Sequence, residues 1–185
     1  MAHEIPRLEI DRLQPGLAGV LRPRVERLGY LGEFFKCMGH QPEALTAFMD
    51  FTERSKGGLA DTLVELVALT VAGVTGNDYE RHQHERLSLK LGLTRDWVAA
   101  VNVLSPDDQP LLGGDAQAVQ RLVLAAVERQ GHDVSDLLGD VTERLGPESA
   151  VAVLFLIGRY VTHSMIVNAL ALEPPVPSIF DREGP

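Results

Sequence analysis

The sequence predicts an all-α protein, and three observations point to this class. The 185 residues are 45% hydrophobic and 23% charged, which is the composition of a globular chain able to bury a core. Aromatic residues make up only 5%, while alanine, leucine and valine are abundant, and this balance favours helices over a sheet. Apolar residues also recur at helical spacing along most of the chain.

The N-terminal region is expected to contain an irregular arm followed by two helices. Residues 1–22 mix proline and glycine with short apolar stretches, which is typical of an arm that packs on the body or on a neighbouring subunit. Pro23 is well placed at a helix start, where its missing N–H is not needed, so a helix is predicted over 23–38. Pro42 opens the next predicted helix, over 42–54.

The middle of the chain predicts a core helix, a charged helix and a short capped helix. Residues 59–75 are apolar nearly all round, as in a helix buried in a core. Gly76 and Asn77 then interrupt the pattern, and a charged helix is predicted over 78–91. Thr94 caps a short helix that follows.

The C-terminal half predicts three further helices after a turn-rich stretch. Residues 105–114 form that stretch, and helices are then expected over 115–130, 135–145 and 147–172. We see no linker that would divide the chain. The sequence therefore predicts one domain of about seven to eight helices over 23–172, between the N-terminal arm and a Pro-rich tail over 173–185.

Charge and cysteine content exclude several classes of function. The 26 acidic residues exceed the 17 Lys and Arg, the net charge is −9, and no basic run is present to neutralise phosphates, so we expect no nucleic-acid partner. Cys37 is the single cysteine, which excludes disulfide scaffolds and cysteine-ligated metal sites within one chain. The apolar run 150–172 is interrupted by Arg159 and His163, and residues 1–7 lack the basic start and apolar region of a secretory signal. We therefore expect a cytoplasmic protein without a membrane partner.

A polar cluster is expected to face the core. Glu65 lies inside the apolar helix, where an unpaired carboxylate would cost several kcal/mol, so it needs a partner. At about 100° per residue, one face of the next helix carries Asn77, Glu80, Arg81, His84 and Ser88 together with Leu87 and Leu91, which we expect to point inward. Glu80 and His84 are four residues apart and can touch. His82 and His84 lie about 200° apart and cannot share a metal ion, so no metal site is predicted.

The spacing of this cluster resembles a known signature. In the carboxymuconolactone decarboxylase and alkylhydroperoxidase-D (AhpD) superfamily, a glutamate is followed after eleven residues by C-x-x-C-x-x-x-H. Here Glu65 and His84 match the glutamate and the histidine, while Asn77 and Glu80 occupy the positions of the two cysteines. The string TGNDYERHQH, from Thr75, is similar to the T-G-x-x-Y-E-x-x-x-H form of cysteine-less members.

Flanking segments extend the resemblance to residues 25–175. GYLGEFFKCMGHQPEALTAF, over 29–48, is similar to the leading helices of the family, and GRYVTHSMIVNALALEPP, over 158–175, is similar to its last helix. The resemblance implies an AhpD-like helical fold assembled as a homo-oligomer, as a dimer, trimer or hexamer. It also implies a pocket near Glu65, Glu80 and His84 at a subunit boundary.

The resemblance does not imply redox chemistry. A thiol peroxidase needs an attacking and a resolving cysteine, and both motif positions lack sulfur. What remains on the motif is a carboxylate, an amide and an imidazole, which are groups suited to proton transfer. The expected function is therefore a cofactor-free acid–base enzyme, a decarboxylase or other lyase or an isomerase, acting on a small organic acid or lactone.

Roles can be assigned to the residues of the motif and of the last helix. His84 is the expected proton donor, with its tautomer fixed by Glu65 or Glu80. The candidate substrate-binding residues are Asn77, Tyr79, Arg81, Arg159 and His163. The alternative is a non-catalytic oligomeric binding protein, in which Glu65 and His84 form a satisfied buried pair and Arg159 and His163 serve a surface or subunit interface.

Overall fold

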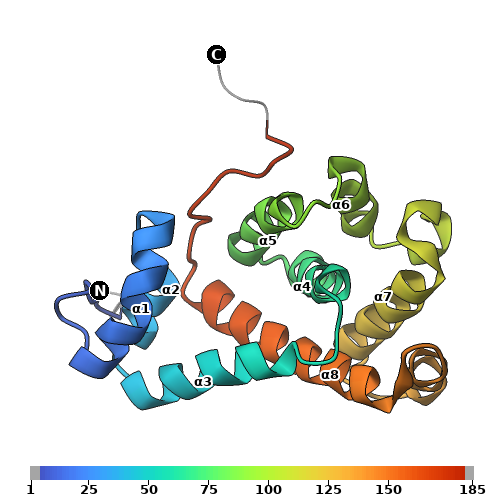
Figure 1. Ribbon diagram of the computed structural model, residues 1–185, viewed down its shortest axis with the longest axis horizontal. Coiled ribbons are helices and arrows are strands. Elements are labelled where there is room, and N and C mark those ends of the chain that lie inside the picture. Colours follow the sequence, from blue (N-terminus) through green and yellow to red (C-terminus); the bar gives the residue numbers. More distant parts are fainter. Residues whose placement is uncertain (1–4, 182–185) are drawn as a thin grey trace. The chain divides into compact units, whose positions relative to one another are not determined.

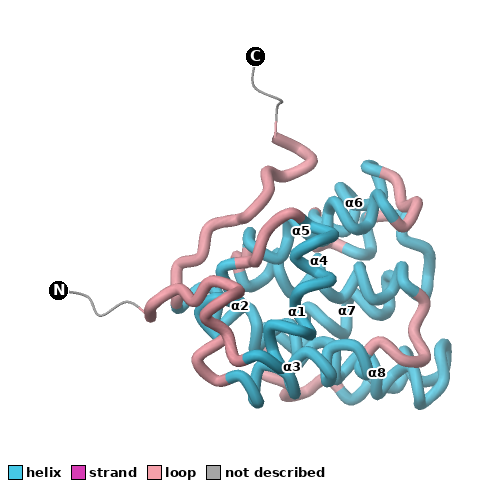
Figure 2. Tube along the Cα trace, turned by 60° about the vertical axis from the view of Figure 1, so that its left-hand side comes forward, coloured by secondary structure: helices cyan, strands magenta, loops and turns pink. Residues whose placement is uncertain are grey.

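The computed structural model describes residues 5–181, and all regular elements in this range are helical (Figures 1 and 2). This confirms the predicted all-α class. The chain divides into two compact units, Met1–Glu53 and Arg54–Pro185, with the division inside a helix, α3 (Pro42–Ser55). The limits at 22 and 172 for arm, domain and tail stay predictions, and residues 1–4 and 182–185 of the arm and tail lie outside the described range.

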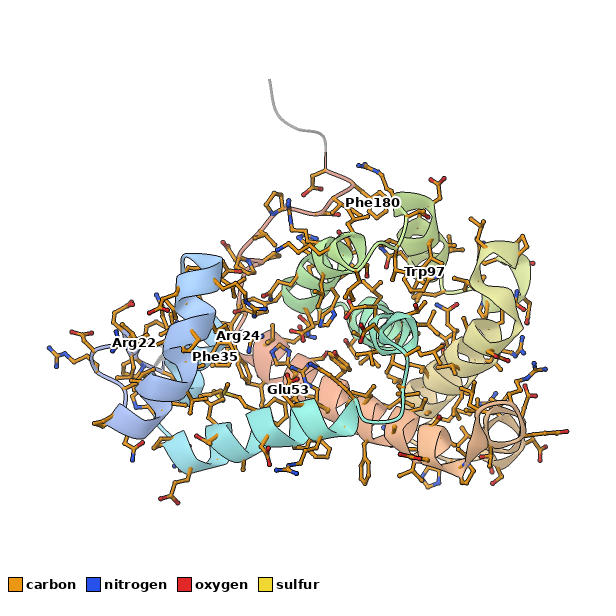
Figure 3. All side chains as sticks on the ribbon, viewed as in Figure 1. Arg22, Arg24, Phe35, Glu53, Trp97 and Phe180 are labelled. Carbon is orange, nitrogen blue, oxygen red and sulfur yellow. The ribbon has the colours of Figure 1, made fainter. Side chains whose placement is uncertain are left out.

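The first unit contains α1 (Pro15–Leu28), α2 (Glu33–Met38) and the first part of α3. The prediction of one helix over 23–38 is wrong, because α1 begins at Pro15, contains Pro23 and ends at Leu28, and α2 is a separate helix. Pro15 occupies the first turn, where a proline needs no N–H, and Gly29 ends α1 in the left-handed region with φ 82°. Arg24 of α1 stacks on Phe35 of α2, 4.9 Å from the ring centroid (Figure 3).

The second unit is built around α4 (Asp61–Thr75). Figure 1 shows this helix end-on, with α5 (Asp78–Lys90), α6 (Arg95–Asn102), α7 (Gly113–Glu128) and α8 (Ser135–Ala169) around it. Two short 3-10 helices, Pro106–Asp108 and Pro110–Leu112, join α6 to α7. Leu66, Val67, Leu69 and Val71 are fully buried, as the apolar pattern of this helix predicts.

The last helix is bent at a glycine. Gly146 has φ 81° and ψ 163° inside α8, so the two predicted helices, 135–145 and 147–172, correspond to the two sides of this bend. Within residues 5–181, α8 is the helix long and apolar enough to cross a membrane by length and composition, but half of its most apolar window is buried inside the protein. That burial is typical of the core helix of a soluble protein, and α8 packs on α4 and α7.

Candidate functional site

The candidate site lies where α4, α5 and α8 meet in the second unit. Glu65 comes from α4, Glu80 and His84 from α5, and Arg159 and His163 from α8. All five side chains are largely withdrawn from solvent, with 3% of the Glu65 side chain and 8% of the Glu80 side chain exposed. The sequence-predicted catalytic residues are therefore neighbours in the structure.

Asn77 fixes the start of α5 against α8. Its side-chain oxygen accepts the backbone N–H of Glu80 at 3.1 Å, which caps the helix, and its Nδ2 donates to Ser164 Oγ at 3.0 Å. On the other side of the same turn, Asn168 Nδ2 donates to the carbonyl oxygen of Thr75 at 2.8 Å. These contacts place the first turn of α5, and with it Glu80, beside the inner face of α8.

His84 is held between two carboxylates. Its Nδ1 lies 2.8 Å from Glu65 Oε2, and its Nε2 lies 3.3 Å from Glu80 Oε1. The ring meets Tyr160 edge to face, with centroids 5.4 Å apart. Ser88 Oγ donates to the same Glu65 oxygen at 3.4 Å. Because an acceptor faces each ring nitrogen, the arrangement favours a proton on both.

The electrostatics favour the imidazolium form of His84. Burial lowers its pKa, but the charge of Glu65 and hydrogen bonds to both carboxylates outweigh burial and raise the pKa to about 9, from an ordinary value of 6.5. His84 is therefore positively charged at neutral pH and holds a proton that it can give up.

Glu80 gathers three positive or protonatable groups. Arg159 Nη1 lies 2.8 Å from Oε1, and His163 Nδ1 lies 3.1 Å from Oε2, in addition to the contact with His84. Burial raises the pKa of Glu80, but the positive groups around it, His163 and Arg159 first, outweigh burial and hold this pKa well below its usual range. Arg159 also lies over the ring of Tyr160, 4.2 Å from the centroid. The two carboxylates thus face the His84 imidazolium and the Arg159 guanidinium, with His163 as a further protonatable group beside Glu80.

The predicted substrate-binding residues fall into different environments. Arg159 and His163 contact Glu80, and Asn77 caps α5. Tyr79 is buried, with its ring centroid 6.2 Å from that of His163. Arg81 is partly exposed and instead contacts Asp78 on its own helix at 2.6 Å.

Two members of the site, Tyr160 and Ser164, were not assigned a role from the sequence. Both are buried, on the face of α8 that carries His163. The signal that could have found them is their helical spacing with Val153, Leu156 and Val167, which are also buried and mark the inner face of this helix.

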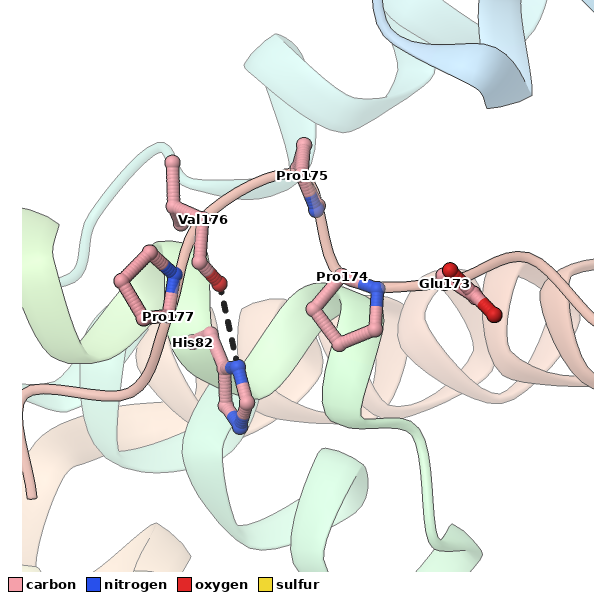
Figure 4. Close-up of a pocket in the computed structure, with 6 residues that line it drawn as sticks. All are labelled: His82, Glu173, Pro174, Pro175, Val176 and Pro177. Atoms are coloured by element: carbon pink, nitrogen blue, oxygen red, sulfur yellow. Dashed lines mark hydrogen bonds between the residues drawn. The ribbon is translucent and has the colours of Figure 1, made fainter. Parts of the chain in front are cut away.

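Two cavities of the described residues lie away from the cluster. One, of about 480 Å³, is lined by His82 and by Glu173 to Pro177 (Figure 4). The other, of about 870 Å³, lies in the first unit between residues of α1 and α3. Neither is lined by Glu65, Glu80 or His84.

The described residues favour neither a reactive cysteine nor a metal site. Cys37 lies in α2 of the first unit and is 1% exposed, and burial raises the pKa of its thiol, which disfavours the reactive thiolate. Within residues 5–181 no group of three or more His, Cys, Asp or Glu side chains is arranged to hold a metal ion.

Comparison with solved structures defines the class of fold. The debrominase Bmp8 in its apo form superposes with a TM-score of 0.81 at 16% identity, over 95% of this chain and 94% of that one. A cysteine-to-alanine variant of Bmp8 in complex with 2,3,4-tribromopyrrole gives 0.79 at 16% identity, over 94% and 92%. An uncharacterised peroxidase-related protein with an AhpD core, from Ralstonia eutropha JMP134, gives 0.81 at 15% identity, over 94% of each chain. The fold is therefore AhpD-like.

Comparison with protein families gives a match over part of the chain. The model of the carboxymuconolactone decarboxylase family matches residues 42–107, which contain Glu65, Asn77, Glu80 and His84. A putative antioxidant defence protein AhpD of unknown function from Agrobacterium tumefaciens is similar in structure, with a TM-score of 0.66 at 21% identity, over 76% of this chain and 96% of that one. No curated protein matches the chain. Over residues 42–107 the chain is therefore similar to the carboxymuconolactone decarboxylase family, and its fold is AhpD-like.

Proposed function

We propose that the protein is a cofactor-free acid–base enzyme, a lyase or isomerase related to carboxymuconolactone decarboxylase, which acts on a small organic acid or lactone. The observation that carries this proposal is the contact of both nitrogens of His84 with carboxylates inside a buried cluster. Such an arrangement keeps a proton on the imidazole and fixes the ring, as a general acid requires.

In a decarboxylation, each residue of the cluster has a defined task. The bond between the substrate carbon and its carboxylate breaks, carbon dioxide leaves, and the electron pair stays on the carbon as an enolate. His84 gives its Nε2 proton to that carbon and is reprotonated from solvent. Glu65, on Nδ1, keeps the ring in place and stabilises its positive form throughout.

The substrate carboxylate takes its place opposite Arg159. Without substrate, Glu80 is paired with both Arg159 and His84. A substrate carboxylate must therefore replace Glu80 as the partner of these two groups. Arg159 is suited to this exchange because a guanidinium binds a carboxylate by paired hydrogen bonds, and His163 adds a second donor on the same helix face. An isomerase or a dehydratase would use the same groups.

The experiment is an assay of the purified protein on γ-lactone carboxylates and small aromatic acids, followed by carbon dioxide release and ultraviolet absorbance. Turnover of one of these compounds by the wild type is expected to be lost in His84→Gln, which cannot supply the proton. Glu143→Gln, at an exposed position of α8, is the control and keeps activity. Full activity of His84→Gln on an identified substrate would show that the assigned role is wrong.

A second function, a non-catalytic binding protein, is favoured by a different observation. The cluster pairs its charges internally, and neither described cavity is lined by its central residues. This protein would turn over none of the assayed compounds, and His84→Gln would reduce its stability without changing its binding of any ligand.

A further inference from the structure

The C-terminal segment runs along α5 and is attached to it by side chains. Residues 174–181, which we call the strap, follow α8 in an extended, Pro-rich course. His82 of α5 donates from Nδ1 to the carbonyl oxygen of Val176 at 3.1 Å, the contact drawn in Figure 4. Arg86, one turn further along α5, donates from Nε to the carbonyl oxygen of Pro177 at 3.0 Å. Both contacts hold the backbone of the strap.

Glu85 makes the central contact between α5 and the strap. Its side chain is fully buried and accepts hydrogen bonds from Ser178 Oγ at 2.6 Å and from the backbone N–H of Ile179 at 3.1 Å. Asn102 of α6 donates to its other oxygen at 3.1 Å. A buried carboxylate is costly unless donors surround it, and here two of the three donors come from the strap.

The strap also has internal order that fits this contact. The backbone N–H of Ser178 donates to Asp181 Oδ2 at 2.9 Å, and Ser178 Oγ accepts the N–H of Phe180 at 3.1 Å. Phe180, labelled in Figure 3, lies under the guanidinium of Arg95 on α6, 5.0 Å from the ring centroid. These hydrogen bonds fix the conformation of the strap in which the Ser178 hydroxyl points at Glu85.

These contacts lie on the side of α5 away from the candidate site. At about 100° per residue, Glu80, His84 and Ser88 share one face, and the residues that hold the strap, His82, Glu85 and Arg86, are centred on the opposite face. Helix α5 has 13 residues, a length that is marginal in isolation, so its position depends on packing. Contacts that hold the strap-facing side of α5 therefore also determine where Glu80 and His84 lie.

We propose that Glu85 is a positioning residue, through which the strap holds α5 so that Glu80 and His84 stay in contact with Glu65 on α4 and Arg159 on α8. The consequence for turnover rests on the acid–base function proposed above. The consequence for the geometry of the cluster does not, and it can be measured without any substrate.

The test uses the full chain with Ser178→Ala and the double variant Arg86→Ala/Ser178→Ala, which loosen the strap without altering any residue of the cluster. The groups that face His84 are Glu65 on α4, Glu80 on its own helix and Tyr160 on α8, and all remain in these variants. Two quantities are measured. The pKa of His84 is determined by NMR titration, with the exposed His132 as internal reference, and the hydrogen-exchange rates of the α5 amides are compared between variants.

We expect the pKa of His84 to fall from about 9 towards 6.5 and the α5 amides to exchange faster, with the larger effect in the double variant. Ser178→Thr keeps the hydroxyl and is expected to restore both values. Ser149→Ala, which removes a serine hydroxyl bound to the Gly58 carbonyl and not in contact with α5 or the strap, is the control and leaves both unchanged. An unchanged His84 pKa and unchanged α5 exchange in the folded double variant would overturn the proposal.

A measurement of turnover distinguishes a failure of this proposal from a failure of the proposed acid–base function. If the wild type converts a substrate, Ser178→Ala is expected to lower kcat, with a pH profile displaced in parallel with the His84 pKa. If no compound is converted, the acid–base function fails while the pKa and exchange data still decide whether the strap positions the cluster.

Discussion

His84 has a carboxylate at each ring nitrogen, and this fixes the chemistry open to the motif. Glu80 stands where the redox signature has its second cysteine, and its Oε1 lies 3.3 Å from His84 Nε2. A carboxylate accepts hydrogen bonds and protons but has no sulfur to oxidise to a sulfenic acid. The substitution therefore excludes a thiol step at this position.

The pH dependence of stability follows from the raised pKa of His84. A group whose pKa is higher in the folded state stabilises it fully below the unfolded value, 6.5, and loses this contribution as the pH rises through about 9. The contribution is on the order of 3 kcal/mol. We expect the free energy of unfolding, measured in urea, to fall between these pH values. The fall is expected to be absent in His84→Gln, and a fall of equal size in this variant would assign it to another group.

Neutralising Glu80 tests how much this carboxylate contributes to the stability of the cluster. Glu80→Gln leaves Arg159 and His84 facing each other without their shared carboxylate, and losing one partner of a buried ion pair costs about 3–5 kcal/mol. The free energy of unfolding is expected to fall by about this amount, and the pKa of His84 is expected to fall with it, because Glu80 is one of the groups that raise it. A variant as stable as Glu143→Gln would contradict the ion network described here.

The core of the site could be predicted from single residues. Glu65 in an apolar helix required a partner, and the spacing of Glu80 and His84 supplied one nearby in sequence. The bond between Arg159 and Glu80 joins residues that are 79 positions apart, and no local rule relates them. The sequence could place Arg159 in the right region, but not show that it already binds a carboxylate of the chain.

At the scale of the helix, α5 depends on its cap. Asn77→Ala removes the acceptor for the Glu80 N–H and the donor to Ser164, whereas Thr94→Ala removes the cap of α6, the acceptor for the Trp97 N–H. Loss of a cap costs about 1 kcal/mol. Urea denaturation is expected to show a larger loss for Asn77→Ala, because Ser164 is buried and loses a partner as well. Equal losses would mean that the contact with Ser164 adds nothing.

The helices that the sequence could locate are those whose ends carry a strong local signal. Gly76 has φ 64° and ends α4, and Thr94 caps α6, and both were predicted from residue type alone. The start of α1 was missed because Pro23 predicts the first residue of a helix. A proline fits the first turn of a helix without cost, but it also occurs inside a helix at a cost in stability. Leu17 and Leu21, both N-terminal to Pro23, are buried and favour the longer helix, and this packing is not visible in the local pattern.

At the scale of the molecule, the outer face of α8 is apolar. Val151, Leu154, Phe155 and Met165 are 39–69% exposed, at helical spacing, and the one charged residue of α8 beyond Glu148, Arg159, is turned inward to Glu80. We propose that this face takes part in a homo-oligomer, because exposed apolar surface of this kind commonly marks an interface.

Light scattering after size-exclusion chromatography tests this proposal. Met165→Glu places a charge on the most exposed of these side chains and is expected to lower the oligomeric mass, since a buried unpaired charge is costly. Leu111→Glu introduces the same charge at a similarly exposed apolar position, 62% exposed, outside α8, and is the control. A monomeric wild type, or a Met165→Glu variant of unchanged mass, would contradict the assignment of this face.

The net charge of −9 counts histidines as neutral, so Glu65, Glu80 and Arg159 together contribute −1 and the rest of the chain, which is largely its surface, carries −8. An organic acid that diffuses towards the protein thus meets repulsion before it meets Arg159. Salt screens this repulsion, with a Debye length of about 10 Å at 0.1 M. For an anionic substrate, kcat/KM is expected to rise with ionic strength, and a fall would indicate a local positive entrance that guides the substrate inward.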